Sequence, residues 1–141
     1  MNSDIDIVVI GCGVAGATAA ETAASLGSRV LALEEHDQVG IPSHCSGHVS
    51  INSMKRLGVE PPQDIIKNQI RGATFHSPTG QVLRLERGAP ITWVLDRKAL
   101  DEHLTAGARK AGVEIHLNSR ALALERSGRG ELQVRISSVS Y

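Results

Sequence analysis

A glycine-rich turn, Gly11-Cys12-Gly13-Val14-Ala15-Gly16, constrains the fold of this chain more than any other feature of its sequence. It follows directly on a nearly continuous β-branched run, Ile5 to Ile10, which is typical of a strand buried on both faces of a parallel sheet. The alanine-rich segment after the turn predicts a helix that ends near Leu26, with Gly27 as its C-terminal stop. Residues 29–33 predict a second strand, so the N-terminal segment is predicted to be a strand-turn-helix-strand unit with a right-handed crossover.

The rest of the sequence predicts further strands and helices, with antiparallel additions to the sheet. We therefore predict an α/β fold: a Rossmann-like domain with a parallel sheet and crossover helices, plus antiparallel hairpins. The remaining predicted elements are a short helix that Ser50 caps and that runs to Leu57, a hairpin of strands 70–76 and 81–86, a strand over 91–95, a helix over 97–111 after the capping residue Asp96, a strand over 113–117, and a hairpin of strands 120–125 and 131–136 around residues 127–130.

Composition and charge exclude several functional classes. Fifteen basic residues balance fifteen acidic ones, which excludes a strongly basic nucleic-acid binder and leaves no polybasic membrane patch. No apolar run approaches the roughly 18–20 residues that cross a bilayer. Two cysteines cannot build a disulfide framework, and the acidic N-terminus does not resemble an export signal. We predict a soluble, cytoplasmic protein that binds no nucleic acid and makes at most peripheral membrane contact.

The three glycines of the turn form the pattern that binds the pyrophosphate of a dinucleotide. Gly11 permits the tight turn, Gly13 lets the backbone approach the pyrophosphate, and Gly16 brings helix and strand together. The helix N-terminus adds N–H donors and a partial positive charge. Glu34 ends the second strand, where its carboxylate can accept hydrogen bonds from an adenosine ribose and repels a 2′-phosphate. The sequence thus predicts an FAD or NAD site and disfavours NADP; the alternative is a glycine turn that only packs.

Three segments resemble known flavoenzymes. Residues 6–40 resemble the N-terminus of FAD-dependent oxidoreductases of the glutathione-reductase and aromatic-hydroxylase type. Residues 41–50, Ile-Pro-Ser-His-Cys-Ser-Gly-His-Val-Ser, resemble the Pro-x-x-Cys-x-Gly segment of geranylgeranyl reductases, which saturate isoprenoid double bonds. Residues 94–101 are similar to the strand-Asp-Arg-helix element of that group, in which the arginine lies near the flavin cofactor. The resemblance selects FAD over NAD as the cofactor.

This resemblance implies an FAD-dependent oxidoreductase most like a geranylgeranyl reductase. FAD would take reducing equivalents from an external donor and pass them to a carbon–carbon double bond of an isoprenoid or other apolar small-molecule substrate. An aromatic-type monooxygenase on the same scaffold and a non-catalytic dinucleotide-binding fragment are the alternatives. In this interpretation residues 1–141 form one FAD/NAD(P)-binding domain, the N-terminal fragment of a longer flavoprotein and inactive alone.

The predicted catalytic residue is Cys45, because the resemblance places its thiol beside the flavin. The alternatives are a packing cysteine and a metal ligand together with His44 and His48. A structural zinc site normally needs four ligands, so we expect no metal. The resemblance also places Arg97 near the flavin cofactor. A helix start disfavours a cation, which favours a role for Arg97 near the pyrophosphate over that of a solvated surface residue. The residues predicted to bind the cofactor are Gly11, Gly13, Val14, Ala15, Gly16, Ala17, Glu34, Glu35, Arg97 and Ala121.

Overall fold

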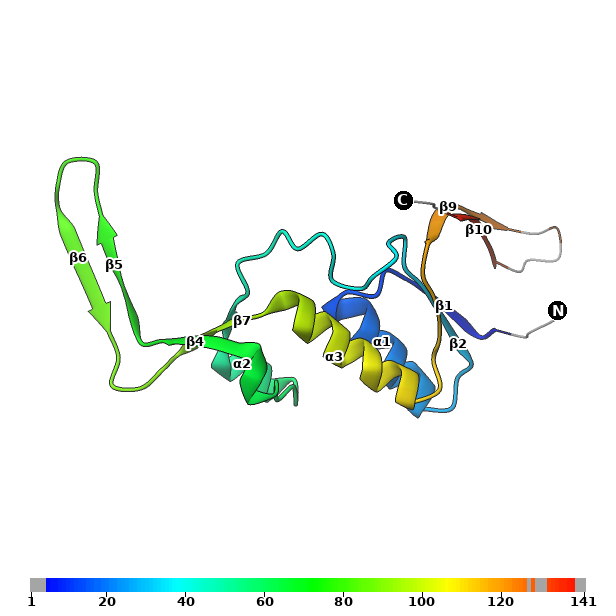
Figure 1. The fold of residues 1–141 in the computed structure, drawn as a ribbon, viewed down its shortest axis with the longest axis horizontal. Helices are drawn as coiled ribbons and strands as arrows, with labels where there is room; N and C mark the ends of the chain where they lie inside the picture. Colours follow the sequence, from blue (N-terminus) through cyan, green and yellow to red (C-terminus); the bar gives the residue numbers. More distant parts are fainter. Residues whose placement is uncertain (1–4, 127, 129–131, 139–141) are drawn as a thin grey trace. The chain divides into compact units, whose positions relative to one another are not determined.

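The structure of the chain, a computed structural model, describes residues 5–126, 128 and 132–138 (Figure 1). Their contacts divide the chain into two compact units, which we describe separately. The first unit holds the described residues up to Pro42 and from Asp101 onward, and the second holds residues 43–100. The turn predicted at residues 127–130 lies outside the described residues except for Gly128. None of the described helices is long and apolar enough to cross a membrane.

The first unit is built on a three-stranded parallel sheet in the order β1-β2-β8. The strands are β1 (Ile7–Ile10), β2 (Val30–Leu33) and β8 (Glu114–His116), and β2 lies in the middle. Helix α1 (Val14–Ser25) connects β1 to β2. A parallel pair needs such a crossover connection, so the predicted strand-turn-helix-strand unit and the α/β fold are confirmed.

Two helices pack against one face of this sheet through small side chains. Ala20 of α1 and Ala108 of α3 (Arg97–Lys110) are buried in one cluster with Val30 and Ala32 of β2. Because Val30 and Ala32 are two positions apart on a strand, they point to the same face, and both helices therefore cover that face. Alanine at the contact lets each helix backbone approach the strand closely.

Strand β1 differs from the prediction of a strand buried on both faces. It is an edge strand of the described sheet, and its Ile7, Val8 and Ile10 side chains are 39%, 38% and 60% exposed. Among its residues, Val9 packs against the buried cluster. The β-branched run therefore predicted the strand correctly and its burial wrongly, because within the described residues α1 and α3 cover only one face.

A hairpin of β9 (Ser119–Arg126) and β10 (Leu132–Ser138) follows β8, as predicted. Its start is fixed to the end of β2: the Ser119 N–H donates to the Glu34 carbonyl at 2.8 Å, and the Asn118 N–H donates to the His36 carbonyl at 3.0 Å. These bonds bring the first residues of β9 next to the segment that follows β2.

The second unit is mainly antiparallel. The predicted strand near 91–95 is present and pairs on both sides, in the order β3-β7-β4, and the predicted hairpin of β5 and β6 is also present. Helix α2 begins as predicted, because the Ser50 hydroxyl accepts the Ser53 N–H at 3.3 Å. The sequence analysis missed β3 and β4. The elements are β3 (His48–Ser50), α2 (Ile51–Arg56), a 3₁₀ turn at Gln63–Ile65, β4 (Ile66–Ile70), β5 (Gly72–His76), β6 (Val82–Glu86) and β7 (Thr92–Leu95).

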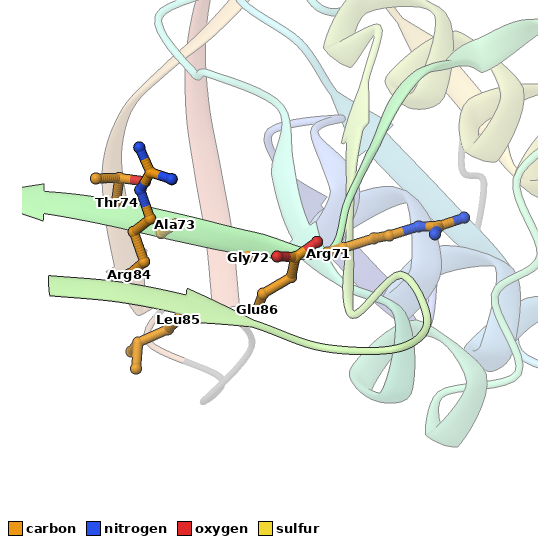
Figure 2. Close-up of a pocket in the computed structure, with 7 residues that line it drawn as sticks. All are labelled: Arg71, Gly72, Ala73, Thr74, Arg84, Leu85 and Glu86. Atoms are coloured by element: carbon orange, nitrogen blue, oxygen red, sulfur yellow. The ribbon is translucent and has the colours of Figure 1, made fainter.

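The β5–β6 hairpin carries a shallow pocket of about 320 Å³ that includes Arg71 at its base. Figure 2 shows Thr74, Arg84 and Glu86 projecting from one side of the hairpin and Leu85 from the other. Thr74 and Arg84 lie on the same side because they are paired across the two strands, and side chains of paired residues share a face. This pocket contains none of the residues predicted to bind the cofactor.

Candidate dinucleotide site

The glycine turn leaves β1 with its backbone held by the end of β2. The Gly11 N–H donates to the Leu33 carbonyl at 2.7 Å, and the Cys12 N–H donates to Glu34 Oε2 at 3.0 Å. Gly11 has a φ of +93°, a conformation that a side chain strongly disfavours. Glycine is therefore required at this first position of the turn.

Gly13 and Gly16 are glycines for different reasons. Gly13 precedes α1 with φ −69° and ψ −176°, and a Cβ atom there would meet nothing within 4 Å. At Gly16 a Cβ atom would overlap the Gly11 carbonyl oxygen and lie 3.3 Å from Val9 Cγ1. Gly13 thus leaves an open approach to the helix N-terminus, whereas Gly16 allows the helix to pack on the turn.

The N-terminus of α1 has the features of an anion site. Gly13 supplies no side-chain cap, and the first turn contains no acidic residue. The first N–H groups of a helix have no acceptor within it and lie at the positive end of its dipole. Val14 and Ala15 occupy these positions, whereas the buried Ala17 donates its N–H to the Gly13 carbonyl at 2.9 Å. The N–H groups suited to a pyrophosphate are therefore those at the start of α1, while the N–H of Ala17 is used within the helix and its predicted contact with the cofactor remains a prediction.

Glu34 joins the end of β2 to the glycine turn. Its side chain is almost fully buried; Oε2 accepts the Cys12 N–H, while Oε1 accepts the His36 N–H at 3.1 Å and lies 2.7 Å from His36 Nδ1. Burial alone would raise the pKa of Glu34, but the hydrogen bonds from Cys12 and His36 outweigh it and lower the pKa. The ionised carboxylate therefore fixes the turn, and its predicted contact with a ribose remains a prediction.

Acid is expected to weaken this connection. The folded-state pKa of Glu34 lies below its ordinary value of 4.5, so ionised Glu34 stabilises the fold above pH 4.5. That contribution is lost as the pH falls through the lowered pKa. Urea unfolding at pH 7 should show Glu34→Gln less stable than wild type by roughly 1–3 kcal/mol, the usual loss for a buried charged hydrogen bond. The difference should shrink towards pH 3.

The matched control for this experiment is Glu35→Gln, which changes a neighbouring half-exposed carboxylate. Glu35 pairs with Arg120 at 3.4 Å near the surface, where an ion pair adds little stability. The Glu35→Gln variant should therefore lose stability towards pH 3 to nearly the same extent as the wild-type chain. A Glu34→Gln stability difference that stays constant from pH 7 to pH 3 would contradict the assigned role of Glu34.

A pocket of about 480 Å³ lies next to Glu34, wholly within the first unit. It brings together four predicted site residues from three parts of the chain: Gly11, Glu34, Glu35 and Ala121. The sequence analysis missed three polar lining residues, His36, Ser119 and Arg120, for which the only signal was their place within two positions of a predicted one. The remaining lining residues are Ile10 and Leu33.

Cys45 lies in the second unit, in the exposed loop before β3. Its Sγ accepts the Gly47 N–H at 3.5 Å. Gly47 has a φ of +72°, and a Cβ atom there would overlap the Leu95 carbonyl oxygen. The glycine of the Pro-x-x-Cys-x-Gly segment is therefore required by the pairing of this loop with β7, while the role of the thiol remains a prediction.

The two cysteines have opposite surroundings. Cys12 is 1% exposed, and burial, followed by the Glu34 charge, raises the pKa of its thiol to about 11. A thiol with this pKa is protonated and unreactive at neutral pH. Any thiol chemistry of the chain therefore belongs to Cys45. Within the described residues, no group of three or more His, Cys, Asp or Glu side chains is placed to hold a metal ion.

Arg97 is the first residue of α3 and is half-buried within the described chain. The helix begins as predicted, because Asp96 Oδ1 accepts the Ala99 N–H at 3.1 Å. The proximity of Arg97 to the flavin cofactor and its role near the pyrophosphate remain predictions.

Comparisons with known proteins agree with this geometry. Residues 6–141 match the family model described as FAD dependent oxidoreductase. A digeranylgeranylglycerophospholipid reductase of Methanothermobacter thermautotrophicus is 38% identical over 96% of this chain and 33% of its own length. The corresponding reductase of Methanocaldococcus jannaschii is 30% identical over 91% of this chain and 32% of its own length. The chain spans about a third of the length of these relatives.

Solved structures share the fold. A geranylgeranyl bacteriochlorophyll reductase-like protein from Thermoplasma acidophilum superposes with a TM-score of 0.82 at 30% identity, covering 93% of this chain and 34% of that one. An aklavinone-11 hydroxylase in complex with FAD and aklavinone gives a TM-score of 0.65 at 23% identity, covering 96% of this chain and 30% of that one. The second likeness shows the fold alone.

Proposed function

The chain belongs to the FAD-dependent oxidoreductase family, and we propose that it is the dinucleotide-binding part of a reductase that saturates carbon–carbon double bonds of isoprenoid lipids. The proposed nucleotide site is supported by one observation above all: the glycine turn is open at Gly13 and lies beside a pocket lined by Glu34. The reductase activity and the lipid substrate are supported by relatives that are 30% and 38% identical and are named digeranylgeranylglycerophospholipid reductases.

The residues of the first unit fit the adenosine diphosphate portion of FAD. The N–H groups at Gly13, Val14 and Ala15 would hold the pyrophosphate, since among the described residues no side chain lies within 4 Å of a Cβ atom at Gly13 and the first turn of α1 has no acidic residue. The pocket beside Glu34 would hold the adenosine. Bound FAD supplies the redox chemistry, accepting reducing equivalents from an external donor. The contribution of this chain is to orient the cofactor and to stabilise its phosphate charge through backbone N–H groups.

Cys45 is the residue of this chain that we place at the reacting end of the substrate. Its exposed loop lies on a rigid strand pair, because the Leu95 N–H donates to the Gly47 carbonyl at 2.9 Å. Loops held in this way commonly present functional groups from a fixed scaffold. The buried Cys12, in contrast, serves the core of the first unit.

Cys45→Ser is expected to keep flavin bound while lowering the single-turnover rate of the whole reductase by about tenfold to a hundredfold, the scale of one misplaced group near reacting atoms. Stability should change little, because the loop is exposed. The measurements are flavin absorbance, melting temperature and reoxidation of reduced flavin by an isoprenoid lipid under anaerobic conditions. Cys12→Ser is the comparison for stability: it buries a hydroxyl and should lower the melting temperature, whereas Cys45→Ser should not.

A destabilised Cys45→Ser variant with normal reoxidation would contradict the proposed role of Cys45. The same preparation separates the reductase from the aromatic-type monooxygenase. Reduced flavin that is reoxidised by the lipid without oxygen identifies a reductase, whereas reoxidation that requires oxygen and hydroxylates an aromatic substrate identifies a monooxygenase. Failure to bind either FAD or ADP would contradict the proposal as a whole.

A further inference from the structure

A buried threonine contacts the glycine turn from a distant part of the sequence. Thr105 lies on α3 and is 1% exposed, and its hydroxyl donates to the Cys12 carbonyl at 3.3 Å across 93 sequence positions. Both residues belong to the first unit. An apolar side chain could fill this buried helix position and would bring no hydroxyl that needs a hydrogen-bond partner. The hydroxyl of Thr105 therefore indicates a role beyond packing.

The Cys12 backbone is held on both sides by buried groups. Its N–H donates to Glu34 Oε2, and its carbonyl accepts the Thr105 hydroxyl. In a planar trans peptide the C=O and the following N–H point in opposite directions. Directing the Cys12 carbonyl at Thr105 therefore turns the Gly13 N–H away from the buried helix. Gly13 is also the position where the turn is open, with nothing within 4 Å of a Cβ atom.

We propose that Thr105 is a positioning residue of the dinucleotide site, whose hydroxyl holds the Cys12–Gly13 peptide so that the Gly13 N–H faces the pyrophosphate. This inference rests on the proposed function, because it requires a dinucleotide at the turn. Without the hydroxyl, the peptide loses the bond that opposes its rotation, and the binding-competent orientation is only partly populated. The apparent affinity falls by that fraction.

The effect is specific to the phosphate part of the ligand. The pocket beside Glu34 and Ala121 does not involve the Gly13 N–H. Loss of the Thr105 hydroxyl should therefore weaken the binding of ADP, which carries the pyrophosphate. The affinity for adenosine should stay almost unchanged. A general loss of folded structure would weaken the binding of both ligands equally. The ratio of the two dissociation constants therefore distinguishes a positioning role of Thr105 from a packing role.

The test uses the 141-residue chain labelled with ¹⁵N and titrated with ADP and with adenosine, with the melting temperature measured alongside. Thr105→Val keeps the shape and removes the hydroxyl; we expect it to raise the Kd for ADP about fivefold to tenfold, the effect of one hydrogen bond. The Kd for adenosine should stay within about twofold of wild type. The Gly13 amide signal should shift with ADP in wild type and much less in Thr105→Val. Thr105→Ser restores the hydroxyl and should restore both readouts.

The matched control is Thr22→Val, because among the described residues the exposed Thr22 hydroxyl bonds within α1, to the Thr18 carbonyl at 2.8 Å. If Thr105→Val does not fold, Thr105→Ala takes its place, and the same change in the ratio of the ADP and adenosine dissociation constants is expected. Equal losses for ADP and adenosine, or a lower melting temperature with an unchanged ratio, would overturn the positioning role alone. A wild-type chain that binds neither ligand would overturn the proposed function, and the role of Thr105 with it.

Discussion

Replacing Gly13 by leucine is expected to weaken ADP and FAD binding by about a hundredfold, because the side chain would block one or two charge-assisted hydrogen bonds to the pyrophosphate. The fold should tolerate the change. The φ of −69° and ψ of −176° at Gly13 suit any residue, and a Cβ atom there meets nothing within 4 Å. Calorimetric titration and thermal unfolding of the same preparation measure the two effects separately.

Gly88→Leu is the matched control for Gly13→Leu. Gly88 lies in the second unit, and a Cβ atom there also meets nothing within 4 Å. The control should alter neither nucleotide affinity nor melting temperature. If Gly13→Leu bound ADP and FAD as tightly as wild type, the pyrophosphate would not lie at this turn, and the dinucleotide site would have to be placed elsewhere in the chain.

The elements that could be predicted from sequence are those with local signals. The glycine turn, α1 and β1 follow from glycine spacing, small residues and a β-branched run, and Ser50 indicates the start of α2 because it is a capping residue. Strands β3 and β4 carry no such signal: β3 is short, and β4 reads Ile-Lys-Asn-Gln-Ile, with polar residues in its middle. They are strands because β7 pairs with both, an interaction between distant segments that no local pattern records.

The same distinction holds at the site. Gly11 and Glu34 were predictable because one turn and one strand end place them. Arg120 reaches the pocket because the Ser119 N–H bonds to the end of β2, and Thr105 reaches the turn because α3 packs beneath it. Both placements depend on tertiary packing. The exposure of β1 was mispredicted for a related reason: an apolar run reports which side chains can be buried, and the covering elements decide which ones are.

Gly16→Ala is expected to destabilise the chain by about 3 kcal/mol or more, at the upper end of the cost of overpacking. At this chain length that corresponds to a fall in melting temperature of about 10 °C. The added methyl group would overlap the Gly11 carbonyl oxygen, a backbone atom. Moving Gly11 would break the hydrogen bond from its N–H to the Leu33 carbonyl. The backbone therefore cannot relieve the clash without a further loss of stability.

The sign of this effect is informative, because alanine is favoured over glycine inside a helix by about 1 kcal/mol. Gly107→Ala in α3 is the matched control. A Cβ atom there would lie 3.0 Å from both carboxylate oxygens of Glu21, the end of a flexible side chain that can move aside. Gly107→Ala should therefore be neutral or slightly stabilising in urea unfolding, whereas Gly16→Ala should be strongly destabilising. A Gly16→Ala variant at least as stable as wild type would show that the Gly11 carbonyl can move, and the turn could not then be the rigid cradle that the pyrophosphate requires.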